Sequence, residues 1–548
     1  MSIPIIDLFA GPGGLGEGFS SITDKKGNRI FDIKLSIEKD EHAHKTLRLR
    51  SFYRKFPEGE APQIYYDYIK ENDSQKQIKL LEDLKEDFHE QWLEAENEAC
   101  KFELPFPEEK KIKRTTDEKG ELVEKEVKVI GYTPEQITQK HNDVDSKIIN
   151  ALNGDNNFLL IGGPPCQAYS LAGRARNQGI SNKDHRVHLY KEYLRIIAKH
   201  QPSVFVMENV KGLLSAKVDG QMMFDLIKDD LKNPDLVFPQ YESQEYKVYS
   251  FVKEPDNYDE DGFPIYTNNK DFLIKTEKYG IPQRRHRVIL LGVRQDLEVE
   301  YKKTLVKGTK ETTLKQVIGS LPKIRSGIGR EVIGTNEKGN HIYGNIPNTA
   351  ENWKLTTQYY LKNLEKYLTK NFTQFISSDS QGLNFFETKT EEQENPLYKT
   401  WYEDKKLQGV LNHESRTHLK EDIGRYLFSS LYLQAKGEFP RLKDYPEELQ
   451  PAHKNRKSGK FADRFRTQKP DQAGTTVTSH ISKDGHYFIH YDPTQCRSLT
   501  VREAARIQTF PDNYYFCGSR THQYHQVGNA VPPYLAKQLA EIVKDLFK

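Results

Sequence analysis

Residues 3–16 read IPIIDLFAGPGGLG, an apolar run that passes into a glycine-rich loop. A short buried strand, a loop that needs glycine and a following helix predict the first βα unit of an open α/β sheet. The next apolar stretch, residues 33–37, ends on Glu38, a carboxylate suited to accept hydrogen bonds from ribose hydroxyls. The pattern alone leaves NAD, flavin and S-adenosylmethionine (AdoMet) open as ligands, and a solvated strand-end charge is the alternative for Glu38.

The strand signal recurs along the chain. Apolar, β-branched runs and helical patterns predict further elements at residues 158–161, 187–199, 203–207, 288–293, 501–508 and 534–546. Strands that alternate with helices in this way predict a parallel, doubly wound sheet.

Composition shifts divide the chain into three expected parts. Residues 1–300 form the sheet domain, 301–490 form a smaller irregular domain, and 491–548 return to the first domain with a C-terminal helix. A charged block at about 75–150 is predicted to be an insertion, with an exposed helix at 79–98 and a β-hairpin at 111–129. Thr133-Pro134-Glu135-Gln136 is a capping box that starts another helix. The charge runs are expected to be solvated faces, with a DNA or partner contact as the alternative.

Overall composition sets only broad limits. The 548 residues are nearly balanced in charge at +3, so any basic surface must be local. The four cysteines show neither metal-ligand spacing nor a disulfide framework, and no metal site is predicted. With no basic-then-apolar signal region and no apolar run long enough to span a bilayer, a soluble protein of a reducing cytosol is expected.

One cysteine has the surroundings of a nucleophile. In Gly163-Pro164-Pro165-Cys166-Gln167 it follows the strand at 158–161, where open α/β sheets place their chemistry. Two prolines stiffen the loop and present the thiol. A small buried apolar residue is the alternative, but a rigid, glycine-bordered loop favours a nucleophile.

Two further groups carry ionisable side chains next to predicted strands. Glu208 ends the strand at 203–207, where poor solvation can raise the pKa of a carboxyl enough for it to share a proton; a helix cap is the alternative. Arg285 and Arg287 fall on one face of an extended segment and can hold an acidic group or bond base and phosphate oxygens. A structural salt bridge is the alternative for either arginine.

Three late segments complete the candidates. Gly528-Asn529-Ala530-Val531-Pro532-Pro533 predicts a tight turn before the last helix. Thr500 and Glu503 form a capping box with a structural role. The segment 453–469 is dense in Lys and Arg with interspersed Phe, which favours phosphate contacts over a solvated loop.

Taken in order, these motifs resemble those of DNA (cytosine-5) methyltransferases. The resemblance is carried by Asp7–Gly14, the Pro-Pro-Cys-Gln loop, Glu208-Asn209-Val210, Gln283–Arg287 and Gly528–Val531, and it spans most of residues 3–294 and 497–541. It implies an α/β, Rossmann-like AdoMet-dependent methyltransferase domain with a smaller, irregular target-recognition domain.

The resemblance also implies roles for single residues. Cys166 matches the nucleophile, Glu208 the acid near cytosine N3, and Arg285 with Arg287 the guanidinium pair, Arg285 being assigned to O2. The implied AdoMet-binding residues are Phe9, Gly11, Gly13, Gly14, Glu38, Asp67, Gly163, Pro165, Leu189, Asn529 and Val531. The implied DNA contacts are Gln167, Ser170, Gln283, Thr478, Lys454, Arg456 and Lys457. Lys39 stands where the family often has an aromatic residue beside the adenine.

The expected function is therefore methylation of a specific duplex DNA sequence at cytosine C5. We expect a bacterial, cytoplasmic and nucleoid-associated enzyme that acts as a monomer on DNA and is paired with a restriction endonuclease. A tRNA substrate is one alternative, and the large basic recognition region favours duplex DNA over it. An inactive DNA-binding regulator predicts loss of Cys166, Glu208 or the glycines, yet all are present. An NAD-dependent oxidoreductase gives the cysteine loop no role.

Overall fold

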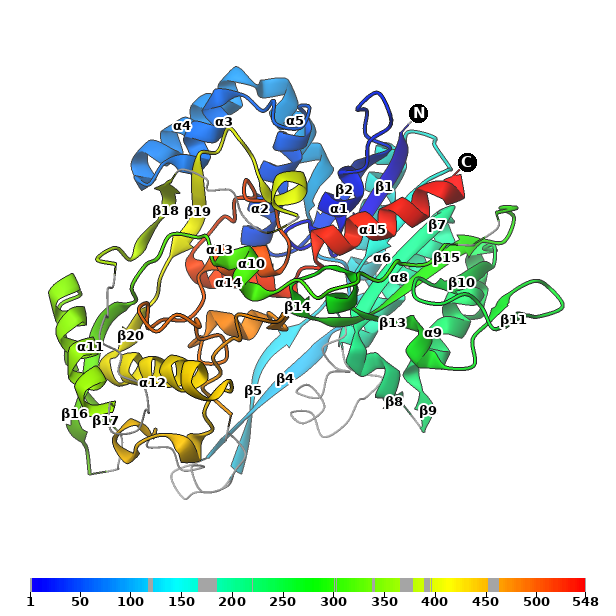
Figure 1. Cartoon of the computed structure of the whole chain (residues 1–548). Helices are drawn as coiled ribbons and strands as arrows, with labels where there is room; N and C mark the ends of the chain where they lie inside the picture. Colours follow the sequence, from blue (N-terminus) through cyan, green and yellow to red (C-terminus); the bar gives the residue numbers. More distant parts are fainter. Residues whose placement is uncertain are drawn as a thin grey trace.

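A mixed eight-stranded sheet organises the larger lobe of the molecule (Figure 1). This computed structural model describes residues 2–116, 122–165, 185–218, 220–299, 301, 303–337, 341–364, 378–388, 395, 397–451 and 463–547. The strand order is β10-β15-β7-β6-β1-β2-β3, and β13 pairs with β15. The strands are β1 (Ile3–Leu8), β2 (Phe31–Glu38), β3 (Ala99–Lys101), β6 (Leu159–Gly162), β7 (Val204–Val210), β10 (Tyr246–Ser250), β13 (Leu273–Lys275) and β15 (His286–Arg294).

The sheet changes direction at one edge. Strands β3, β2, β1, β6 and β7 are parallel to one another, as predicted. Strand β15 is antiparallel to β7, with Ile289 opposite Glu208, and β10 and β13 are antiparallel to β15. The parallel arrangement that the sequence predicted does not extend to β15, because residues 251–285 contain no α-helix to carry the chain back across the sheet.

Alternate residues of each strand build two cores, one on each face of the sheet. Ile6 and Leu8 point toward a layer of α6 (Pro134–Leu152), α8 (His185–His200) and α9 (Met223–Lys232). Ile5 points to the other face, which α1 (Gly14–Ser20) and α15 (Pro533–Val543) cover. Each such side chain contributes about 1.5–3 kcal/mol through burial. The last helix of the chain thus packs beside the first one (Figure 1).

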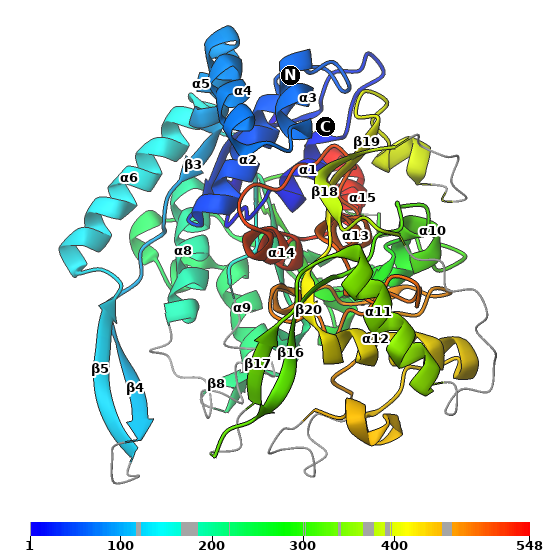
Figure 2. The ribbon, with the colours of Figure 1, turned by 90° about the vertical axis from the view of Figure 1, so that its left-hand side faces the viewer.

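The charged block at 75–150 is only partly an insertion. The predicted helix at 79–98 is two helices, α4 (Ser74–Asp87) and α5 (His89–Glu98), and Phe88 caps one and begins the other. The predicted hairpin is present as β4 (Glu109–Thr116) and β5 (Leu122–Ile130), which project from the body (Figure 2). Between α5 and the hairpin, β3 joins the main sheet, and after the hairpin α6 packs on β2. Strand β3 and helix α6 therefore belong to the core.

The smaller lobe has its own apolar core around Trp353, Tyr426 and Leu427. Its main elements are β16 (Gly327–Thr335), β17 (His341–Asn345), α11 (Ala350–Leu364), β18 (Gly382–Glu387), β19 (Gly409–Glu414), β20 (Thr417–Leu419) and α12 (Lys420–Lys436). The chain then passes through α13 (Val501–Ile507) and α14 (Arg520–Asn529), which lie between the two lobes, to α15 (Figures 1 and 2). No helix in the described part of the chain is long and apolar enough to cross a membrane.

Candidate active site

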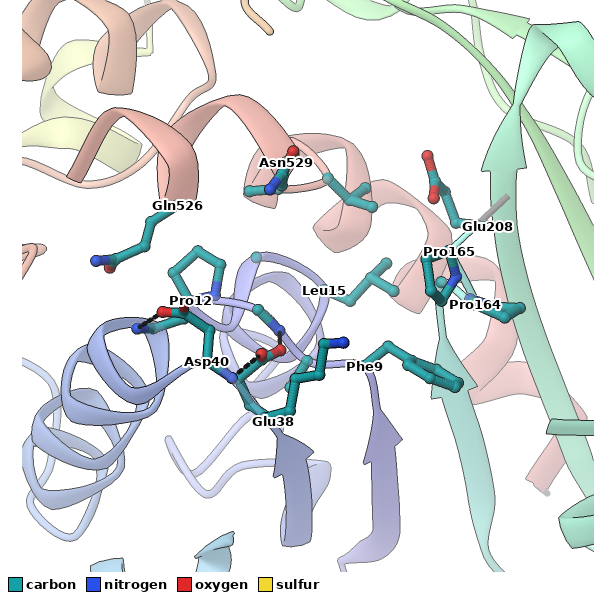
Figure 3. A pocket seen from close by; sticks show the side chains of 18 of the residues that line it. Phe9, Pro12, Leu15, Glu38, Asp40, Pro164, Pro165, Glu208, Gln526 and Asn529 are labelled. Carbon is teal, nitrogen blue, oxygen red and sulfur yellow. Dashed lines mark hydrogen bonds between the residues drawn. The ribbon is translucent and has the colours of Figure 1, made fainter. Parts of the chain in front are cut away.

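A cavity of about 480 Å³ lies at the carboxyl ends of β1, β2, β6 and β7. Its size suits a small-molecule ligand, and its position is the usual one for ligands of open α/β sheets. Its walls come from the loop after β1, the ends of β2 and β3, the loop after β6, the end of β7 and the α14–α15 junction. Figure 3 shows Glu38 and Glu208 on different sides of this space.

The glycine loop after β1 forms one wall because it can pack without side chains. Gly11 and Gly13 have φ angles of +58° and +95°, which favour glycine. A Cβ built on Gly14 would lie 2.4 Å from the carbonyl oxygen of Val531, so the loop and the α14–α15 junction touch through backbone. Gly11 and Gly14 line the cavity, whereas Gly13 faces Leu47 and is not among the lining residues.

Glu38 is held at the end of β2 by backbone donors. Its Oε2 accepts a hydrogen bond from Gly11 N–H at 2.8 Å, and its Oε1 accepts one from Asp40 N–H at 2.7 Å (Figure 3). Burial raises the pKa of Glu38, and these two bonds oppose that rise. The carboxylate is thus fixed at the cavity wall, at the strand end where a carboxylate that accepts hydrogen bonds from ribose hydroxyls is expected.

The acid predicted near the adenine is not at the cavity. Asp67 lies on α3 (Gln63–Lys70), is exposed, and accepts a hydrogen bond from Gln63. Next to the end of β2, the cavity is lined by Phe102 and Glu103, which directly follow β3. Nζ of Lys39 lies 3.2 Å from Glu103. Glu103 is not among the residues predicted from the sequence, because β3 has three residues and lies inside a charged block. Its one signal was the alternation Cys100-Lys101-Phe102-Glu103 after the helices.

The stiff loop after β6 reaches the cavity. Gly163, Pro164 and Pro165 line it, and a Cβ on Gly163 would lie 3.0 Å from Glu208 Oε2. The predicted nucleophile Cys166 follows Pro165 directly but lies outside the described residues. The predicted DNA contacts Gln167, Ser170, Lys454, Arg456 and Lys457 also lie outside them.

Glu208 and Arg287 form an ion pair inside the cavity. Arg287 Nε lies 2.7 Å from Glu208 Oε1, and the two side chains are 13% and 14% exposed. The pairing follows from the strand register, in which Ile289 is opposite Glu208 and Arg287 is opposite the neighbouring Val210. Burial lowers the pKa of Arg287, and the adjacent carboxylate opposes that shift. The pair offers a carboxyl and a guanidinium together to one planar polar ligand.

Arg285 lies deeper and makes different contacts. It is 2% exposed, and its Nη1 donates to the carbonyls of Val477 at 2.7 Å and Gly528 at 3.2 Å. Burial and then the charge of Arg287 lower its pKa. Arg285 lines the cavity, but the guanidinium that contacts Glu208 belongs to Arg287.

The remaining candidates divide into cavity residues and one buried residue. The lining includes Phe9, Leu189, Thr478, Asn529 and Val531. Gln283, predicted to contact DNA, is fully buried. Its Nε2 donates hydrogen bonds to Ile507 O and Gln508 Oε1, and its Oε1 accepts one from Val477 N–H. The prediction of a DNA contact is wrong for this structure, because the side chain hydrogen-bonds β14 to the end of α13 and to Val477, which precedes Thr478.

The chain is similar to known DNA methyltransferases. The family model for C-5 cytosine-specific DNA methylases matches residues 126–238 and 258–545. The chain is similar to the Type II methyltransferase M.Bpa9945I of Bacillus paralicheniformis, with 31% identity over 99% of this chain and 98% of that one. It is also similar to the DNA (cytosine-5-)-methyltransferase M.ApeKI of Aeropyrum pernix, with 25% identity over 74% of this chain and 84% of that one. A crystal structure of a DNA modification methyltransferase encoded within an E. coli prophage shares the fold, with 18% identity, a TM-score of 0.51, and coverage of 100% and 99%.

The mixed α/β architecture with its large central sheet is that of an AdoMet-dependent methyltransferase fold, as the sequence predicted. Within that class the chain belongs to the C-5 cytosine-specific DNA methylase family. It is therefore a DNA (cytosine-5-)-methyltransferase.

Proposed function

We propose that this enzyme methylates C5 of a cytosine turned out of duplex DNA, through a transient bond between Cys166 and cytosine C6. One observation carries the proposal: the Glu208–Arg287 pair and the glycine loop with Glu38 line a single cavity. A methyl donor held at Glu38 and a cytosine held at Glu208 would therefore share one space.

The cavity fits AdoMet at the end that Glu38 occupies. Glu38 would receive the ribose hydroxyls, Phe102 and Glu103 lie at the neighbouring strand end, and Gly11 and Gly14 allow close approach of the backbone. When bound, AdoMet supplies an electrophilic methyl group on a sulfonium centre.

Glu208 and Arg287 have the chemistry needed to hold the substrate ring. A carboxyl bonded to cytosine N3 and a guanidinium bonded to O2 stabilise the charge that develops when C6 is attacked. The register of β7 and β15 supports Arg287 for O2, and the hydrogen bonds of Arg285 support a positioning role for it between the lobes.

Cys166 would act as the nucleophile from the stiff loop next to Glu208. Its thiolate forms a bond to C6, which leaves C5 electron-rich enough to take the methyl group. Loss of the C5 proton and cleavage of the C6–S bond then restore the ring and the thiolate. Nearby guanidinium groups favour the thiolate form that the attack requires.

The target base must leave the helix for this chemistry, at a cost of a few kcal/mol that protein–DNA contacts offset. We infer a role in a Type II restriction–modification system from the names of M.Bpa9945I and M.DdeI, which is 27% identical over 71% of this chain. A cognate restriction endonuclease, action as a monomer on DNA and a place at the bacterial nucleoid belong to the same proposal.

Bisulfite sequencing of DNA from cells that express the protein tests the proposal. Protected cytosines within one recurrent sequence are expected, and Cys166→Ala should abolish the protection while leaving AdoMet binding within about threefold. Methyl groups on N4 of cytosine or on adenine, found by nucleoside mass spectrometry, would contradict it. So would equal activity of the wild type and the variant.

A further inference from the structure

A second hollow, of about 430 Å³, adjoins the active-site cavity. Thr478 lines both spaces, so the two share a wall at that residue. The other lining residues that matter here are Arg284, Arg466, Thr476, His480 and Tyr487.

The hollow is built onto the short strand that directly precedes the active-site arginines. Strand β14 (Gln283–Arg284) pairs in parallel with β21 (Gly474–Thr475), which joins the sheet lobe to the smaller lobe. Thr476 Oγ1 donates to the carbonyl of Arg284 at 2.7 Å. Because side chains alternate along an extended segment, Arg285 points into the active-site cavity while Arg284 points into the hollow.

Two arginines line the hollow, and each is paired with a carboxylate that is not itself part of the lining. Among its described lining residues there are two arginines and no carboxylate. The Arg284 side chain is 47% exposed, with Nε 3.2 Å from Glu311 and Nη2 2.8 Å from Gln472. Such an exposed ion pair contributes little, about 0–1 kcal/mol, so an incoming anion can displace Glu311.

Arg466 is the second cation and is oriented by its neighbours. Its guanidinium pairs with Asp463 and lies 5.5 Å from the centre of the Tyr487 ring. Its Nε is shielded from solvent and has no hydrogen-bond partner among the residues that the structure describes. A shielded donor of this kind costs free energy unless a ligand supplies an acceptor.

We propose that this hollow binds the phosphodiester backbone of the methylated strand next to the target cytosine. The proposal rests on the proposed function, because that function places the target base in the cavity on the other side of Thr478. A strand that enters the cavity through one nucleotide must continue past Thr478, and its next phosphates need cations. Arg284 and Arg466 supply two, and His480 and the hydroxyl of Thr476 add polar groups at the wall.

The test is the salt dependence of duplex binding by the full-length protein. Each lost phosphate contact reduces the slope of log K against log salt by about 0.9. Arg284→Gln should therefore lower the slope by about 0.9, and Arg284→Gln with Arg466→Gln by about 1.8, twice the single value. The control is Arg294→Gln, which removes a pair with the exposed Asp296 at the far end of β15 and lies outside the hollow. Its slope should match that of the wild type.

A second measurement locates the contact. A duplex that carries the methylated sequence receives one neutral methylphosphonate linkage at each position around the target. A neutral linkage within two nucleotides of the target should lower the affinity of the wild type about tenfold, or by about 1.4 kcal/mol. The same linkage should not lower the affinity of Arg284→Gln any further.

The slope measurement needs no methyl transfer, so the two proposals can fail separately. A protein that methylates cytosine but keeps its salt slope in both variants would overturn the hollow's role. The hollow's role would also be overturned if the neutral linkage lowered the affinity of Arg284→Gln as much as it lowers that of the wild type. A reduced slope in a protein that does not methylate C5 would support the contact and refute the proposed function.

Discussion

The Glu208–Arg287 pair gives the most quantitative prediction for catalysis. Arg287→Gln removes the guanidinium that lies 2.7 Å from Glu208 while keeping a polar side chain of similar length. Unit charges about 4 Å apart interact with about 4 kcal/mol at an effective dielectric constant of 20. Removal of one preorganised donor from a catalytic site costs about 10²–10³-fold in kcat, or about 2.7–4 kcal/mol. We expect a loss of this size for Arg287→Gln.

Single-turnover transfer of a radiolabelled methyl group measures the loss directly. Binding of AdoMet should stay within about threefold, because the described bonds of Arg287 go to Glu208 and to the carbonyl of His286. Arg294→Gln is the matched control, since Arg294 ends the same strand and pairs with Asp296 at the surface. The double variant with Glu208→Gln should lose little more than either single variant, because the two groups act as one unit. Activity of Arg287→Gln above a tenth of the wild-type level, with the fold intact, would refute the reasoning.

Two further predictions concern the cofactor wall and acid stability. Gly14→Ala places a Cβ 2.4 Å from the Val531 carbonyl oxygen and should weaken AdoMet binding about tenfold, as measured by calorimetry. The control Gly334→Ala, whose Cβ meets no atom within 4 Å, should bind AdoMet as the wild type does. Equal affinities of the two variants would contradict a role of the Gly14–Val531 contact in AdoMet binding. Burial opposes ionisation of Glu503, but the charge of Arg497 outweighs it and holds the pKa of Glu503 below its usual value. The free energy of unfolding that this group contributes is therefore present above its unfolded pKa and lost as pH falls through the folded one. Urea midpoints should fall less steeply on acidification for Glu503→Gln than for the wild type, and parallel acid profiles would contradict this.

The sequence predicted best those features that depend on neighbouring residues. The capping boxes at Thr133 and Thr500 are present, because their donors and acceptors lie three residues apart. Strand β1 and the glycine loop also form as predicted, since the apolar run and the positive φ angles are local requirements.

Features set by pairing between distant segments were predicted less well. The direction of β15 and its register against β7 decide that Arg287, not Arg285, contacts Glu208. The burial of Gln283 depends on Gln508, which is 225 residues away. Glu103, and not Asp67, lines the cavity, because the three-residue strand β3 joins the sheet beside β2. None of these pairings has a signal within a short window of sequence.

Covalent capture on DNA tests the central claim most directly. A duplex that carries the methylated sequence with 5-fluorocytosine at the target should trap the enzyme, because fluorine cannot leave C5 as a proton does. Peptide mapping should then find the pyrimidine bonded through C6 to the sulfur of Cys166. Sustained methylation of ordinary cytosine without any such adduct would contradict the account.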